Sequence, residues 1–180
     1  MSPVRSAALI AIAAIDKANR KAGEVLRWLV LVIPFITVGY AVVRRLTPWG
    51  HNGFSEAQWF LYAWVFMAGT GYTLLKNGHV RVDVLSARWP WRTRCRVEIA
   101  FHVLLWPACA YMAWHFWIYW FASASGPDGP EDVLIGLQRW PLKLAFFAGF
   151  ALLLLQSLAE VLRRIAWLQG WLVMPQVETA

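Results

Sequence analysis

Four apolar segments, each about as long as a membrane span, constrain the fold of this chain more than any other feature. They cover residues 25–43, 57–75, 99–121 and 144–162. An α-helix needs about 20 apolar residues to cross the hydrocarbon layer, and it satisfies its backbone hydrogen bonds internally. A composition of 59% hydrophobic and only 15% charged residues agrees with this interpretation. The sequence predicts an all-α integral membrane protein with four transmembrane helices.

The basic residues between these segments predict the orientation of the chain. An even number of spans places both termini on the same side as the central loop. This side would carry twelve basic residues, namely Arg5, Lys17, Arg20, Lys21, Lys76, Arg81, Arg88, Arg92, Arg94, Arg96, Arg163 and Arg164. The other side would carry four, namely Arg44, Arg45, Arg139 and Lys143. Because short cytoplasmic loops are enriched in lysine and arginine, both termini are expected in the cytoplasm.

The segment before the first span has two interpretations. Arg5 and the apolar run over residues 7–15 have features of a short signal peptide. The chain continues through Asp16, Lys17 and Arg20 without a turn signal, which favours an amphipathic helix on the membrane surface. The predicted order is then a cytoplasmic-side arm (1–24), span 1 (25–43), a periplasmic loop (44–56), span 2 (57–75), a basic cytoplasmic loop (76–98), span 3 (99–121), a periplasmic loop (122–143), span 4 (144–162) and a cytoplasmic tail (163–180).

The central loop contains the stretch "NGHVRVDVLSARWP", residues 77–90. Val80, Val82 and Val84 alternate with polar residues, which is the period of a strand. An isolated strand beside lipid would leave backbone groups unpaired, so a short interfacial helix ending at Pro90 is the better prediction. The residues expected to anchor this loop to lipid headgroups are Arg88, Trp89, Trp91, Arg92 and Arg94.

Several short motifs follow one another along the chain. They are "FSEAQWFLYAWVF" with Glu56, "MAGTGYTL", "GHVRVDVL" with His79, Arg81 and Asp83, and "RWPLKLAFFAGFALLLLQSLAEVLRR" with Lys143. Their order resembles that of the DctQ-type small membrane subunits of tripartite ATP-independent periplasmic (TRAP) transporters. The resemblance covers residues 25–164 or so.

The resemblance implies a scaffold subunit without chemistry of its own in the bacterial inner membrane. Its partners would be a large DctM-type membrane subunit, which carries substrate and sodium, and a periplasmic solute-binding protein that delivers an organic acid. No catalytic residue, cofactor or metal is expected. The residues given a structural or subunit-contact role are Glu56, His79, Arg81, Asp83 and Lys143. Glu56 could instead favour the positive end of a helix, and Arg81 and Asp83 could be ordinary solvated charges.

The distribution of polar residues supports a passive role without the resemblance. A transporter that moves its own substrate has ionisable or unwound positions near the bilayer midplane. Here the charged residues lie at the ends of the predicted spans. Two polar pairs, Glu98 with His102 and Gln156 with Glu160, are each spaced by one helical turn and are expected to face neighbouring helices.

Other functions are disfavoured by missing residues. His102 and His115 would lie about 20 Å apart on one helix, as axial ligands of two haems do, but no second span supplies opposing histidines. A small drug exporter would need a carboxylate within the first span, and residues 28–43 contain none. His79 and Asp83 lack further ligands for a metal. The net charge of +7 is not accompanied by a nucleic-acid-binding motif.

The second periplasmic loop, rich in Gly, Pro and acidic residues over 122–140, is expected to be irregular. It would either cover the partner subunit or contact the binding protein. The first role is favoured because the delivering protein must dock over the substrate path.

Overall fold

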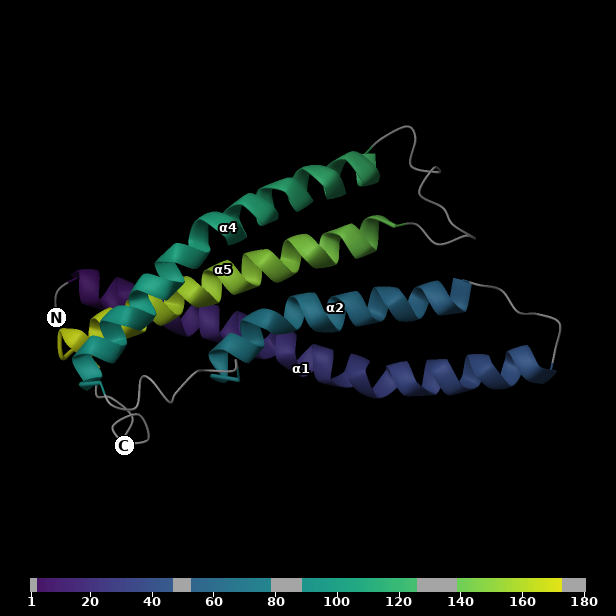
Figure 1. Ribbon diagram of the computed structural model, residues 1–180, viewed down its shortest axis with the longest axis horizontal. Helices are drawn as coiled ribbons and strands as arrows, with labels where there is room; N and C mark the ends of the chain where they lie inside the picture. Colours follow the sequence, from purple (N-terminus) through teal and green to yellow (C-terminus); the bar gives the residue numbers. More distant parts are fainter. Residues whose placement is uncertain (1–2, 47–52, 79–88, 126–138, 173–180) are drawn as a thin grey trace.

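The computed structural model describes residues 3–46, 53–78, 89–125 and 139–172, which form four long α-helices (Figure 1). These are α1 (Pro3–Leu46), α2 (Gly53–Leu75), α4 (Trp91–Ser125) and α5 (Trp140–Leu168). The described residues contain no strand, which confirms the predicted all-α class. The interfacial helix predicted within residues 77–90 falls mostly on residues 79–88, outside the described part of the chain.

The four helices alternate in direction (Figure 1). The beginnings of α1 and α4 therefore lie at the same end of the molecule as the ends of α2 and α5. Among the described residues, three helices are long and apolar enough to cross a membrane, over Arg5–Leu46, Trp91–Ser125 and Trp140–Leu168. The remaining helix, α2, has 23 residues, which is about 34 Å at 1.5 Å per residue, and it is not among these three candidates.

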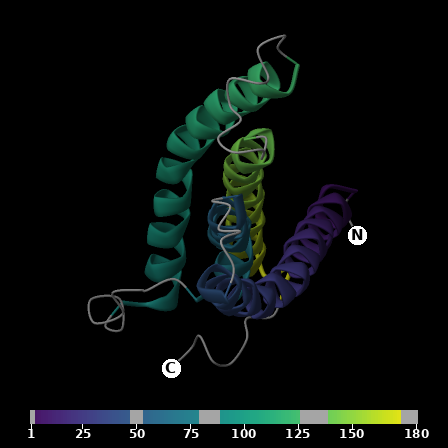
Figure 2. The ribbon, with the colours of Figure 1, turned by 90° about the vertical axis from the view of Figure 1, so that its right-hand side faces the viewer.

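The helices extend beyond the apolar segments that the sequence marks. α1 is continuous from Pro3, so the predicted arm and the first apolar segment form one helix. α4 begins directly after Pro90, whose carbonyl accepts a hydrogen bond from the Thr93 amide. Pro34 and Pro107 lie inside α1 and α4, where each removes a backbone donor and favours a bend. Figure 2 shows α4 changing direction along its length.

α5 is the central helix, and it packs against α1, α2 and α4. Towards α4 the contact is aromatic: Phe116 stacks on Phe146 and Phe150 with ring centroids 4.9 and 5.8 Å apart. Trp117 lies 5.0 Å from Phe147 in the same interface. Large flat rings fill the space between these two helices.

Towards α2 the contact of α5 depends on small residues. A Cβ atom added to Gly149 would lie 2.6 Å from the Met67 carbonyl oxygen, and one added to Gly71 would lie 3.1 Å from the Leu152 carbonyl oxygen. The first distance is far inside van der Waals contact and the second is tight, so glycine at these two positions lets the backbones of α2 and α5 approach closely. Such small-residue contacts are typical of helix packing in membranes.

The outer faces of the helices are strongly apolar. Phe35 on α1, Trp59 on α2 and Leu104 on α4 are 78%, 74% and 73% exposed. Side chains of this size at such exposure, repeated along α1 and α4, form a far larger apolar surface than soluble monomers carry. This surface requires lipid or a protein partner around it.

Candidate functional site

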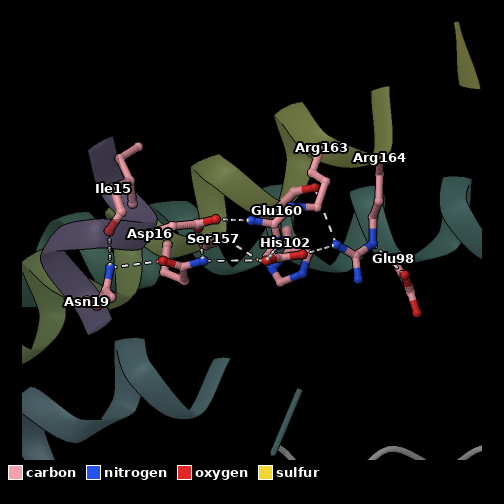
Figure 3. A network of polar contacts seen from close by, with 10 residues as sticks. Ile15, Asp16, Asn19, Glu98, His102, Ser157, Glu160, Arg163 and Arg164 are labelled. Carbon is pink, nitrogen blue, oxygen red and sulfur yellow. Dashed lines mark hydrogen bonds and ion pairs between the residues drawn. The ribbon is translucent and has the colours of Figure 1, made fainter. Parts of the chain in front are cut away.

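Ten polar or aromatic side chains connect α1, α5 and α4 at the end of the molecule where α1 begins, and Figure 3 shows the contacts among most of them. We call this cluster the polar junction. Its members are Asp16 and Asn19 from α1, Glu98, His102 and Trp106 from α4, and Gln156, Ser157, Glu160, Arg163 and Arg164 from α5. The helix spacing explains the convergence, because residues three or four apart share one face of a helix.

The link between α1 and α5 is made by two amides and a carboxylate. Asn19 Nδ2 donates a hydrogen bond to Gln156 Oε1 at 2.9 Å, and Gln156 Nε2 donates one to Asp16 Oδ1 at 3.1 Å. Asn19 and Gln156 have no exposed surface. Arg163 completes this half of the junction with an ion pair to Asp16 at 2.6 Å and a second to Glu160.

Arg164 is the centre of the other half. Its side chain is 1% exposed and pairs with Glu160 on its own helix and with Glu98 on α4. Arg94 lies 3.7 Å from the other oxygen of Glu98. A guanidinium stays charged in proteins and forms bidentate contacts with carboxylates, so it suits a buried position between two of them.

The charges of the junction are paired once Arg94, which lies beside it on α4, is included. Three carboxylates (Asp16, Glu98 and Glu160) face three guanidinium groups (Arg94, Arg163 and Arg164). A buried charge is tolerated only when it is paired and hydrogen-bonded. The observed pairing therefore accounts for the burial of Glu160 and Arg164, which are 3% and 1% exposed.

A serine on α5 is in hydrogen-bond contact with two side chains of α4. Ser157 Oγ lies 3.0 Å from His102 Nδ1 and accepts a hydrogen bond from Trp106 Nε1 at 3.1 Å. These contacts, with that of Glu98 to Arg164, confirm that both polar pairs noted in the sequence face neighbouring helices. His115, in contrast, is exposed and lies 4.3 Å from Tyr111. In the part of the chain that the structure describes, no group of three potential metal ligands comes together.

Lys143 lies away from the junction, near the start of α5. It is buried, and its Nζ lies 3.9 Å from the centre of the Tyr119 ring on α4. A cation over the face of an aromatic ring is attracted by the ring's quadrupole. The structure thus gives Lys143 a contact inside the subunit, and a contact with another subunit stays a prediction.

The predicted anchoring residues gather at the start of α4. Trp89, Trp91 and Arg92 are exposed, and the Arg92 guanidinium lies 5.4 Å from the Trp91 ring. Arg94 is partly buried by its pairing with Glu98. The remaining predicted residues, His79, Arg81, Asp83 and Arg88, and the side chain of Glu56, lie outside the described part of the structure.

Sequence reasoning missed six members of the junction, and Trp106 and Ser157 were among those not singled out. Asp16 was assigned to a surface arm, Asn19 was not singled out, and Arg163 and Arg164 were counted only as basic residues of the tail. A signal was present, because Asp16 and Asn19 are one turn apart and therefore share a face of α1. What the sequence could not show is that this face meets the end of α5.

The fold and the junction define a class: a helical membrane protein whose polar side chains lock its helices together at one end and whose outer faces are apolar. Comparison with known families shows to which family of membrane proteins the chain belongs. The family model for tripartite ATP-independent periplasmic transporters, DctQ component, matches residues 35–166. The chain belongs to this family, as the sequence motifs predicted. No curated protein and no solved structure matches the chain at a significant level.

Proposed function

We propose that this chain is the scaffold on which the large membrane subunit of a TRAP transporter is held. In this role it takes part in sodium-gradient-driven uptake of an organic acid that a periplasmic binding protein delivers. The DctQ family consists of components of such transporters, and the observation that carries the scaffold role is the polar junction. Its charged groups are directed at one another inside the bundle, which makes them helix-locking groups rather than a substrate path.

The surface supports the same role. α1 and α4 expose long apolar faces, while α5, the most buried helix, joins the other three. A subunit built in this way can present a rigid apolar wall to a partner that moves. In our proposal α1, α2, α4 and α5 all span the inner membrane with both termini in the cytoplasm, where the basic loop is attracted to anionic lipids.

The motif residues Arg81 and Asp83 are assigned a structural or subunit-contact role in this proposal. The test uses proteoliposomes that contain the large subunit with and without this chain, an imposed sodium gradient, the binding protein and a panel of labelled organic acids. We expect uptake of a labelled acid only when this chain is present. We also expect the Arg81→Ala/Asp83→Ala double variant to support less uptake than the wild-type chain. If uptake were the same with and without the chain, the scaffold role would be contradicted. If the double variant supported as much uptake as the wild-type chain, only the role assigned to Arg81 and Asp83 would be wrong.

A further inference from the structure

A groove with a volume of about 270 Å³ lies between α1 and α2. α1 contributes Glu24, Leu26, Arg27 and Val30 to its lining, and α2 contributes Val65 and Gly69. The volume is close to the lower end of small-molecule pockets, about 300–1,000 Å³. The groove therefore suits part of an acyl chain rather than a whole lipid.

The groove has a polar end and an apolar end. The two helices are antiparallel, with Gly23 next to Tyr72 and Leu26 next to Gly69. This register places Glu24 at one end of the groove, Arg27 in the middle, and Val30 with Val65 at the other end. The polar end coincides with the start of the first apolar segment, at residue 25. It would therefore lie at the depth of the headgroups when α1 crosses a membrane.

A glycine keeps the groove open. A Cβ atom added to Gly69 would meet only Leu26 Cδ1, at 3.8 Å, which is an ordinary contact. A Cβ atom therefore fits at this position, and because Gly69 lines the groove a longer side chain there would occupy part of its volume. This differs from Gly149, where the Met67 backbone blocks any added atom.

The charges that line the groove have opposite signs. Glu24 and Arg27 are spaced by three residues on α1, and both are exposed. A guanidinium binds phosphate through charge-assisted hydrogen bonds, and a carboxylate accepts them from an ammonium group. A phospholipid with a primary ammonium headgroup carries both of these groups on adjacent atoms of one molecule.

We propose that this groove binds phosphatidylethanolamine, with the phosphate at Arg27, the ammonium group at Glu24 and one acyl chain between Val30 and Val65. A helix of a partner protein is a poorer occupant, because covering Glu24 and Arg27 would strip both charges of water. A lipid headgroup leaves them hydrated. The proposal depends on the membrane placement of α1 and α2 that the proposed function includes, and it does not depend on the transporter partner.

The test measures lipid retained by the purified full-length chain after reconstitution into vesicles of equal parts phosphatidylethanolamine, phosphatidylcholine and phosphatidylglycerol. Native mass spectrometry after detergent extraction identifies the bound lipid. Wild type is expected to retain phosphatidylethanolamine in preference to phosphatidylcholine, whose methylated headgroup has no N–H to donate. Gly69→Leu, which fills the groove, is expected to lose this lipid. Gly39→Leu is the matched control, since a Cβ there meets nothing within 4 Å.

Two surface variants test the headgroup contacts without altering the packing. Glu24→Gln is expected to lower the preference for phosphatidylethanolamine over phosphatidylcholine by about fivefold, and Arg27→Gln to lower retention of all three lipids by a similar factor. Equal retention of the two zwitterionic lipids by wild type would overturn the proposal, as would unchanged retention by Gly69→Leu. If Gly69→Leu fails to fold, the lipid retained by Glu24→Gln and Arg27→Gln tests the proposal instead, and unchanged retention by both variants would overturn it.

Co-purification with the large subunit separates this proposal from the proposed function. A chain that binds phosphatidylethanolamine but captures no large subunit would uphold the groove assignment and contradict the scaffold role. A Gly69→Leu variant that keeps its lipid and loses the large subunit would instead assign the groove to a protein partner.

Discussion

Asn19 on α1 and Gln156 on α5 share a hydrogen bond of 2.9 Å, and neither side chain has any exposed surface. This contact joins the first and last helices of the chain. Arg5 adds a second link at the same end, since its guanidinium donates to the Trp171 carbonyl oxygen at 2.9 Å. The N-terminal part of α1 is therefore packed on α5 along one face, while Lys17 and Arg20 stay exposed on another.

The Asn19–Gln156 hydrogen bond is expected to contribute measurably to stability. Interhelical hydrogen bonds in membrane proteins have coupling energies of about 0.6 kcal/mol on average and up to about 1.7. A double-mutant cycle with Asn19→Ala and Gln156→Ala, followed by reversible unfolding in mixed micelles, should give a value in this range. Gln156→Ala alone should cost more than Asn19→Ala alone, because Gln156 also donates to Asp16. Strict additivity of the two single losses would show that this contact contributes nothing.

Replacing Arg164 is expected to be the most damaging single change in the junction. Arg164→Met would remove the one cation that Glu160 and Glu98 share and leave them only Arg163 and Arg94, and breaking a buried pair in this way costs about 3–5 kcal/mol. Arg92→Gln is the control, because Arg92 is exposed beside Trp91. Unfolding in mixed micelles should show a large loss for the first variant and a small one for the second. Equal losses would mean that the junction does not stabilise the bundle.

Gly149 is expected to tolerate no side chain. Gly149→Ala would place Cβ against the Met67 backbone and push α2 away from α5, at a cost of about 1–3 kcal/mol. Gly39→Ala, on the open side of α1, should leave stability unchanged or slightly raised. The two thermal unfolding midpoints in detergent provide the comparison. A midpoint of Gly149→Ala at or above wild type would show that α2 and α5 do not pack this closely.

Lys143 allows a test between an internal and an external role. Lys143→Met removes the cation over the Tyr119 ring and is expected to cost the isolated subunit about 0.5–2 kcal/mol. Lys76→Met removes an exposed and more distant contact with Tyr72, at 5.9 Å, and should cost less. If Lys143→Met left the isolated subunit unchanged and weakened only its complex, the residue would act at a subunit contact instead.

The sequence predicted the helices well because apolar length is a local property. A run such as residues 99–121 is apolar whatever lies beside it, and α4 includes all of it. Pairing between helices is not local. Glu98 and Arg164 are 66 residues apart, and the charge of Arg164 alone is equally compatible with a solvated tail. Only the position of α5 between α1 and α4 shows that this arginine is buried.

The same distinction explains what the motifs revealed. The small residues of "MAGTGYTL" indicated the family, and the structure shows what one of them does: a Cβ atom at Gly71 would collide with Asn19 Oδ1 on α1 and lie 3.1 Å from the Leu152 carbonyl oxygen on α5. The one-turn spacing of Gln156 and Glu160 correctly predicted a helix contact. It could not predict that Asn19 and Asp16 would be the partners, because neither segment contains a local signal that the two segments pack together.

We propose that this chain holds a larger membrane subunit of the transporter. The most direct test is to purify the tagged chain in mild detergent from its native host and to identify co-purifying proteins by quantitative mass spectrometry. We predict a roughly stoichiometric, much larger multi-span membrane protein of the transporter. Recovery of the chain alone, or with a haem-containing redox enzyme, would contradict the account.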